Sequence, residues 1–290
     1  MLIVDLAFLF ALSASFSYAL CDMGIRSGLQ YTNAFIGSTI VLTSSLIIYL
    51  AFILFFQSTF PNLGIHYFWI IFAGACNPGL FLIFYLTGIS KIGVARAAPI
   101  KGSSPILGTL LGILILSEEP TWKNLAGIAI VFSGITLISF EKIEGGWKKI
   151  HIVWPIASAV VASFAAVFWR KGLQEFPDTT VGTTIGTLVG LMIVGTYTVF
   201  TTKNFSEANL KKSLKPFLFA GLVMASGFYC YTKSMQLGEV YRMLPIVQTS
   251  PIFTVTLAFL IMRKIEKLTW RVPAGCLMTV GGALLVNLRW

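Results

Sequence analysis

Two long apolar stretches of this chain are interrupted by prolines in the same pattern. In the first stretch, Arg96 precedes Pro99 by three residues, and Pro105 follows six residues later. The second stretch repeats this spacing 146 residues further on, from Arg242 to Pro251. A proline within a helix removes a backbone donor and obstructs the carbonyl one turn earlier, so both helices should be kinked or broken. Duplicated, interrupted apolar helices indicate a membrane carrier with a site near the bilayer midplane.

The composition predicts that lipid surrounds most of the chain. Of its 290 residues, 56% are hydrophobic and 11% are charged, whereas soluble proteins carry about 25% charged residues. Apolar runs of about 17–25 residues, the length that crosses a bilayer, recur ten times. They are approximately Leu2–Cys21, Ala34–Phe56, Tyr67–Leu86, Ile92–Leu116, Thr121–Phe140, Ile152–Trp169, Thr179–Phe200, Phe217–Thr232, Val240–Met262 and Trp270–Leu288. The predicted fold class is an all-α integral membrane protein with ten transmembrane helices.

The second half of the chain repeats the first half. The matching residues keep their order: Ala14, Ser15 and Phe16 recur as Ala162, Ser163 and Phe164, and Trp122, Gly127 and Gly134 recur as Trp270, Gly275 and Gly282. Each half holds five predicted spans, and because five is odd, the second half must enter the membrane in the opposite sense. The sequence therefore predicts two inverted five-helix repeats, residues 1–145 and 146–290, related by a pseudo-two-fold axis in the membrane plane.

The residues around and after the first proline break resemble the sequence pattern of a known family. Pro105 lies within the fourth span, Glu118 follows at its exit, and Gly127 and Gly134 are spaced along the fifth span. These features are similar to the drug/metabolite transporter superfamily, specifically to its ten-span members with two tandem EamA-type repeats. The resemblance covers essentially the whole chain and implies a transporter fold without indicating a substrate. The second repeat departs from the pattern, because Lys264 stands where Glu118 stands in the first.

Loop charges and the family resemblance disagree about orientation. Basic residues gather in the odd-numbered loops between spans, for example Lys148, Lys149, Lys211 and Lys212. By the positive-inside rule these loops face the cytoplasm and both termini face outward. Similar ten-span proteins usually keep both termini in the cytoplasm, so the orientation stays open. The short loops favour the cell (inner) membrane of a prokaryote as the location.

Lys101 is the sharpest candidate for substrate contact. It lies about ten residues into the fourth predicted span, hence about 14 Å deep at about 1.5 Å per residue. A charge at the bilayer centre costs about 2.5–3.5 kcal/mol on insertion scales. The sequence shows no acidic residue at a matching depth, so we expect Lys101 to line a polar cavity, with a structural ion pair as the alternative.

Other candidate substrate-binding residues lie near the breaks or in neighbouring spans. Arg96 and Arg242, near the ends of the two interrupted spans, either extend to lipid headgroups or attract an anion at opposite membrane faces. The neutral candidates are Asn77, Ser104, Tyr229, Gln248 and Ser250. Ser103, Ser104, Thr249 and Ser250 stand beside the breaks, where hydroxyls can satisfy the freed carbonyls.

Small residues predict close helix packing. Gly182, Gly186 and Gly190 form two successive GxxxG patterns, which favour intrachain packing, with a homodimer seam as the alternative. Because two repeats are already fused, a monomer is sufficient. Trp169, at the predicted end of the sixth span, is interpreted as an anchor at the membrane interface.

The sequence also argues against several other classes of function. The four cysteines lack metal-binding spacing, and the net charge of +10 is spread over the loops instead of forming one nucleic-acid-binding face. The chain has no Walker A motif for ATP. We therefore expect no metal, no cofactor and no nucleic-acid partner. The predicted first span lacks the mid-span acid with which four-span multidrug relatives exchange protons for cationic drugs, since Asp22 falls beyond its end.

The favoured function is secondary transport by alternating access. The expected cargo is a small neutral or anionic metabolite, such as an amino acid or a phosphorylated or carboxylated compound, and the expected partners are this cargo and the lipid bilayer. The alternatives are a non-transporting assembly or sensor subunit and an exporter of toxic or drug-like compounds. An integral-membrane enzyme is disfavoured, because the sequence offers no credible cluster of acids, histidines or arginines.

Overall fold

The computed structural model describes residues 5–56, 64–92, 97, 100–139, 148–176, 178–202, 209–262 and 271–287, and within these residues every regular element is a helix. The α-helices are α1 (Leu6–Gly28), α2 (Ala34–Phe56), α3 (Ile65–Gly74), α4 (Phe81–Ile92), α6 (Ser104–Leu116), α7 (Trp122–Ser139), α8 (Val153–Glu175), α9 (Thr179–Thr201), α10 (Leu210–Leu237), α11 (Val240–Val247), α12 (Ser250–Met262) and α13 (Arg271–Asn287). A π-helical turn, η1 (Ala75–Leu80), joins α3 to α4, and a 3-10 turn, η2 (Lys149–Ile152), precedes α8. Each predicted span thus coincides with a helix or with consecutive helical pieces.

Within the described ranges, six helical segments are long and apolar enough to cross a membrane. They are Leu6–Gly28, Ala34–Phe56, Tyr67–Ile92, Lys149–Glu175, Thr179–Thr201 and Leu210–Leu237. Shorter apolar helices make up α6 and much of α7 and α13.

Several helices extend past their predicted ends, among them three that continue beyond a charged residue. α1 continues to Gly28 instead of stopping at Cys21, α8 continues to Glu175, and α10 begins at Leu210. A span predicted from hydropathy ends at the first charged residue. The helix itself can continue past that residue wherever the charged side chain reaches water or a polar partner. The first of these differences matters most, because it places Asp22 inside α1.

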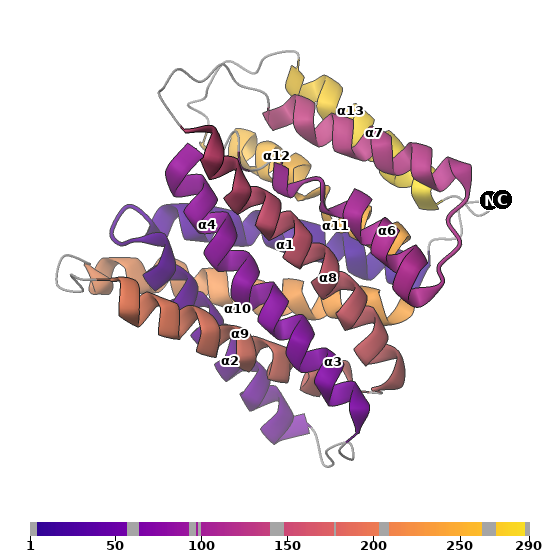
Figure 1. Cartoon of the computed structure of the whole chain (residues 1–290). Coiled ribbons are helices and arrows are strands. Elements are labelled where there is room, and N and C mark those ends of the chain that lie inside the picture. Colours follow the sequence, from indigo (N-terminus) through magenta and orange to yellow (C-terminus); the bar gives the residue numbers. More distant parts are fainter. Residues whose placement is uncertain are drawn as a thin grey trace.

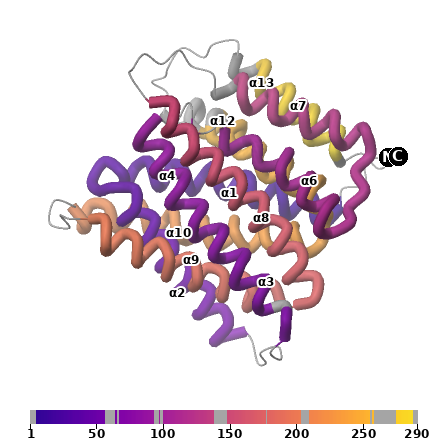
Figure 2. The backbone as a smooth tube through the Cα atoms, viewed as in Figure 1, coloured from indigo at the N-terminus to yellow at the C-terminus, as the bar shows by residue number. Residues whose placement is uncertain are grey.

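Helix packing follows the internal repeat (Figures 1 and 2). α1 packs along α10, as α8 packs along α3 and α4. α12 packs on α1, as α6 packs on α8. α2 contacts α9, and α7 and α13 lie side by side at one edge of the molecule. Within the described residues, these main helix contacts of one half therefore have counterparts in the other half.

Glycine pairs set the contact between α7 and α13. A Cβ atom added at Gly127 would lie 2.8 Å from the carbonyl oxygen of Gly282, and one added at Gly134 would lie 2.7 Å from that of Gly275. These are two repeat-related pairs, and only a missing side chain permits such a close backbone approach. The Asn124 amide then donates across the contact to the Val286 carbonyl at 2.7 Å.

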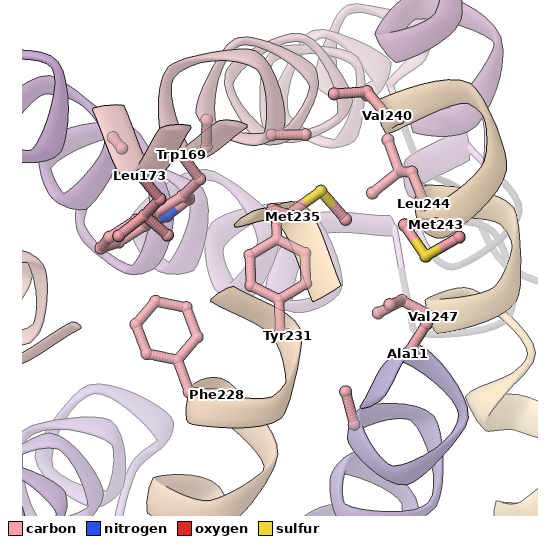
Figure 3. Packing of buried hydrophobic residues seen from close by; sticks show 14 of the residues in the cluster. Ala11, Trp169, Leu173, Phe228, Tyr231, Met235, Val240, Met243, Leu244 and Val247 are labelled. Atoms are coloured by element: carbon pink, nitrogen blue, oxygen red, sulfur yellow. The ribbon is translucent and has the colours of Figure 1, made fainter. Parts of the chain in front are cut away.

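The core of the molecule lies between α8, α10, α11 and α1 (Figure 3). Trp169 and Leu173 of α8 are fully buried, and the Trp169 ring meets Phe228 of α10 edge-on at 5.7 Å. Met243 and Val247 of α11 lie near α1. The interpretation of Trp169 as an interface anchor is therefore wrong: since α8 runs on to Glu175, the indole lies within the helix and faces the core.

The glycines of α9 pack inside the chain. Gly182 lies against Leu173, Gly186 against Trp169 and Gly74, and Gly190 against Pro78. All three are buried. This face of α9 is thus occupied by α3, η1 and α8 of the same chain, as the intrachain interpretation of the two GxxxG patterns expects.

Candidate functional site

Both proline-bearing spans are broken at equivalent positions. α6 begins at Ser104 after a turn at Gly102 and Ser103, and α11 and α12 are separated by Gln248 and Thr249. The Ser103 hydroxyl donates to the Ile100 carbonyl at 2.6 Å, and the Thr249 hydroxyl donates to the Ile246 carbonyl at 2.7 Å. The two breaks thus carry the same local hydroxyl bond, to carbonyls that also accept the Ser103 and Thr249 amides. The predicted repair of the carbonyls freed by the prolines stays a prediction.

The two breaks meet each other. Lys101 Nζ donates to Gln248 Oε1 at 3.3 Å, and Gln248 Nε2 donates to Ser104 Oγ at 2.7 Å. Close by, Gly108 of α6 leaves room for Leu244 of α11, whose Cδ2 would lie 2.6 Å from an added Cβ atom. One polar chain thus links the interrupted span of the first half to that of the second.

Hydroxyls from two further helices reach the same breaks. Ser15 of α1 shares a 2.8 Å hydrogen bond with the Thr249 hydroxyl, and Ser163 of α8 donates to the Ser104 carbonyl at 3.0 Å. Ser15 and Ser163 are repeat-related, and both are fully buried. The breaks are consequently held by directional bonds, and not by apolar packing alone.

The Lys101 ammonium lies beside two aromatic rings of α4. Its Nζ is 5.7 Å from the ring centre of Phe81 and 5.6 Å from that of Tyr85, and these two rings stack on each other. Both distances lie within the range of cation–π attraction. The side chain is half-buried, so part of it remains accessible.

Asp22 is the acidic residue near Lys101 that the sequence analysis missed. It interacts electrostatically with Lys101 and with Tyr85, and its own side chain is exposed. Six residues separate Asp22 from the end of α1, which places it about 9 Å inside the helix. The sequence analysis placed Asp22 at the edge of the first span because the apolar run was ended at Cys21, and so did not consider it beside Lys101.

The remaining candidates near the centre have protein partners. The Asn77 carbonyl accepts from Trp169 Nε1 at 3.4 Å, and its side chain is hydrogen-bonded to Tyr231. Tyr229 is half-buried, meets Phe10 edge-on and is hydrogen-bonded to Thr180.

Ser250 is half-buried at the start of α12. Its backbone carbonyl accepts a hydrogen bond from the Thr254 hydroxyl at 3.1 Å. Arg96 lies outside the described residues.

Comparison with known families identifies this arrangement. The profile of the EamA-like transporter family matches the chain twice, over residues 5–140 and 149–288. The chain belongs to the EamA-like transporter family. With its six long apolar helices, this makes it an integral, multi-pass membrane protein.

Similarity to solved structures supports the fold of this EamA-like protein. One of them, described only as "Crystal structure of protein", superimposes with a TM-score of 0.82 at 16% sequence identity. The match covers 97% of this chain and 98% of the other. The comparison with curated proteins gave no match.

Arg242 of this EamA-like protein is buried in an ion network. Its guanidinium lies 3.0 Å from Glu239 and 3.6 Å from Asp5, and its side chain is 5% exposed. The structure thus places it inside the protein, at the junction of α1 and α11, instead of among lipid headgroups.

Glu118 lies at the same end of the molecule as the Arg242 ion network. Its carboxylate accepts the Val240 and Tyr241 amides at 2.8 and 3.2 Å, which caps the free N-terminus of α11. Arg170 of α8 interacts electrostatically with Glu118 and donates to the carbonyls that end α10, at Met235 and Gln236. α8, α10 and α11 are therefore tied to the N-cap of α1 and to the segment that follows α6.

The two grooves that stand out on the surface lie elsewhere. One lies among Ile83, Met192 and Phe200, and the other among Ile106, Leu110 and Ile128. Their apolar linings suit contact with lipid tails. They offer no charged group for a polar ligand, so the candidate site remains at the meeting breaks.

Proposed function

We propose that this EamA-like protein is a secondary transporter, built from two inverted five-helix repeats, that moves a small metabolite by alternating access. The observation that carries the proposal is the meeting of two repeat-related helix breaks at Lys101, Gln248 and Ser104. Interrupted helices leave backbone groups free for a ligand, and inverted repeats supply two matching outlets. One chain contains both repeats, so a monomer in a prokaryotic cell membrane is sufficient for the activity.

The cost of burying charge supports this assignment. A lysine deep in a bilayer costs about 2.5–3.5 kcal/mol on insertion scales and is retained mainly where it serves a site. Among the described residues, the identified direct contacts of the Lys101 ammonium are a neutral amide and two rings, which leaves its charge available to a polar cargo. Gln248 and Ser104 add neutral donors and acceptors at the same point.

The two ends of α1 differ in a way that suits a transporter state whose site is accessible from one side of the membrane. At its N-terminus, Asp5 joins the buried network of Arg242 and Glu239. Asp22 lies 17 residues further along, hence about 25 Å away, and is exposed. We infer that the site is sealed at the Asp5 end and approached from the other end.

Reconstitution tests the proposal. Purified protein is screened by thermal shift against amino acids, nucleotides, sugar phosphates and cationic dyes, and each compound that stabilises it is then followed as a radiolabelled substrate in proteoliposomes. We expect saturable flux, reduced about tenfold or more in Lys101→Ala but not in Lys91→Ala, whose side chain is exposed at the end of α4. Absence of flux for every stabilising compound, together with a stably co-purifying protein, would instead favour an assembly or sensor subunit.

A further inference from the structure

The first half of α10 has one covered face and one uncovered face. On the covered face, Gly28 of α1 and Gly37 of α2 both lie against the ring of Phe217, which is fully buried. The uncovered face carries large apolar side chains. Leu218, Phe219 and Leu222 are 46%, 50% and 57% exposed. Since α10 is long and apolar enough to cross a membrane, these side chains face lipid.

Three exposed lysines stand at the start of the same face. Lys211 precedes Lys215 by four residues, and Lys215 precedes Leu218 by three. Side chains at these spacings are neighbours on one side of a helix, so the charged band continues directly into the apolar band. We call the whole face the α10 stripe: Lys211, Lys212, Lys215, Leu218, Phe219 and Leu222.

The charge of the α10 stripe is not neutralised by the rest of the described chain. α10 itself contains no acidic residue. Within the described part of the chain, no ion pair involves the three lysines. The stripe therefore presents a concentrated positive charge at one end and uncharged surface at the other.

Hydrogen bonds fix the backbone that carries the lysines. The Asn209 amide donates to the Tyr31 carbonyl at 3.0 Å, and the Asn209 side chain accepts the Lys212 amide at 3.3 Å. The Ser213 hydroxyl, which is buried, donates to the Leu210 carbonyl at 3.2 Å. The first turn of α10 is thus held in place before any ligand arrives, which lowers the entropy cost of binding.

The length of α10 sets the depth of each band. At about 1.5 Å per residue, its 28 residues span about 42 Å, whereas the hydrocarbon core of a bilayer is about 30 Å thick. The stretch without charged residues, 216–232, spans about 25 Å and fits within that core. The lysines then lie at the level of the lipid headgroups, and Leu218, Phe219 and Leu222 lie among the acyl chains.

We propose that the α10 stripe is a docking site for an anionic phospholipid. The headgroup phosphate accepts hydrogen bonds from the ammonium groups of Lys211, Lys212 and Lys215, and the acyl chains lie along Leu218, Phe219 and Leu222. Charge complementarity selects this occupant, since clustered lysines at headgroup level attract anionic lipids. The site goes beyond the proposed transport function and does not depend on it.

Two other occupants fit the α10 stripe less well. A second copy of the chain packed symmetrically on this face would set lysine against lysine, and like charges repel. A free anion such as phosphate would satisfy the lysines but would leave Leu218, Phe219 and Leu222 without a partner. A phospholipid matches both bands at once.

The test compares two lipids that differ only in the headgroup. Phosphatidylglycerol, which is anionic, and phosphatidylcholine with the same acyl chains, which has no net charge, are titrated into the delipidated full-length protein in detergent. Native mass spectrometry counts the bound lipids and also reports the oligomeric state. We expect phosphatidylglycerol to bind about tenfold or more tightly than phosphatidylcholine. Equal affinities in the wild type overturn the proposal without the need for any variant.

A triple variant locates the site on α10. Each lysine near an anionic headgroup contributes about fivefold to affinity, so the combined substitutions Lys211→Gln, Lys212→Gln and Lys215→Gln should weaken phosphatidylglycerol binding about 100-fold. Binding of phosphatidylcholine should be unchanged. A variant that elutes as a monodisperse protein and keeps the wild-type affinity for phosphatidylglycerol refutes the site.

A second triple variant controls for net charge. Lys91, Lys148 and Lys149 are also exposed, at the end of α4 and at the start of η2. Replacing these three with glutamine removes the same charge, but we expect phosphatidylglycerol affinity to stay within about threefold of the wild type. Equal losses in the two triple variants would show that overall charge, and not the α10 stripe, attracts the lipid.

The same measurements distinguish the other occupants. Inorganic phosphate should not displace phosphatidylglycerol, and displacement would make the stripe a simple anion site. A dimer that appears in the wild type and is lost when the α10 lysines are replaced would assign the stripe to a second copy. Selective lipid binding without flux in proteoliposomes would leave the lipid site standing and refute the transporter, whereas flux without lipid selectivity would do the reverse.

Discussion

At the scale of single residues, charged groups in this EamA-like protein are tolerated in the interior only with specific partners. Arg242 lies between two acids, Glu118 accepts two backbone amides, and Lys101 lies over two rings within electrostatic range of Asp22. An apolar environment penalises each charge, and these contacts offset the penalty. Apart from Glu239, which precedes Arg242 by three residues, these partners come from other segments of the chain, which explains why the sequence alone did not reveal them.

Glu118 should contribute to stability through the α11 amides. Glu118→Ala leaves the Val240 and Tyr241 amides without their acceptor, and loss of a helix cap costs about 1–2 kcal/mol. We expect a lower melting temperature in detergent, measured by tryptophan fluorescence. Glu119→Ala, which removes the exposed neighbouring carboxylate, should melt like the wild type. Equal melting temperatures for both variants would contradict a capping role.

The pH dependence of this contribution has a definite sign. Burial raises the pKa of Glu118 above its ordinary value of 4.5, and the amides of Val240 and Tyr241 oppose the shift only in part. A carboxyl group whose pKa is raised on folding stabilises the fold below its unfolded pKa, and this contribution is lost as the pH rises through the folded pKa. The melting temperature of the wild type, relative to Glu118→Gln, should therefore fall as the pH rises above about 4.5. A relative increase over the same range would refute the shift.

At the scale of helices, the sequence predicted what depends on local pattern. Both breaks appear where the prolines place them, and the hydroxyls of Ser103 and Thr249 make equivalent bonds to the turn at each break. Helix ends were less predictable, because hydropathy ends a span at its first charge, whereas tertiary contacts carry α1 past Asp22. The links from Lys101 and Ser104 to Gln248 depend on how two distant segments cross, and no local pattern encodes that crossing.

The contact between α7 and α13 offers a matched test of glycine packing. A Cβ atom at Gly282 would lie 2.7 Å from the Gly127 carbonyl oxygen, whereas one at the neighbouring Gly281 would meet nothing within 4 Å. Gly282→Ala should lower stability by about 1–3 kcal/mol, because rigid backbone must move apart. Gly281→Ala should be neutral or slightly stabilising, since alanine favours helix over glycine. Thermal denaturation in detergent compares the two, and equal effects would show that the close approach is not stabilising.

At the scale of the whole molecule, the repeat is symmetric in packing but not in charge. The acids that hold Arg242 are Asp5 and Glu239. The repeat-related positions in the sequence are occupied by Val153 and Gly93, so the corresponding Arg96 lacks acids at those places. Among the described residues, this ion network lies at the Asp5 end, and in the proposed transport cycle it favours the state sealed at that end.

This bias predicts how Arg242→Gln changes access to the site. In a background with Cys21, Cys76, Cys230 and Cys276 replaced by alanine, Leu244→Cys places a thiol one turn inside the network, where Leu244 is 3% exposed. Without the ion pairs the sealed state loses about 1–3 kcal/mol of its advantage, so an impermeant maleimide applied from the Asp5 side should label this thiol about 5–150-fold faster. Arg26→Gln, an exposed change at the other end of α1, serves as the control and should leave the rate unchanged. A thiol that stays equally protected in Arg242→Gln would mean that apolar packing, and not the asymmetric ion network, keeps this end closed.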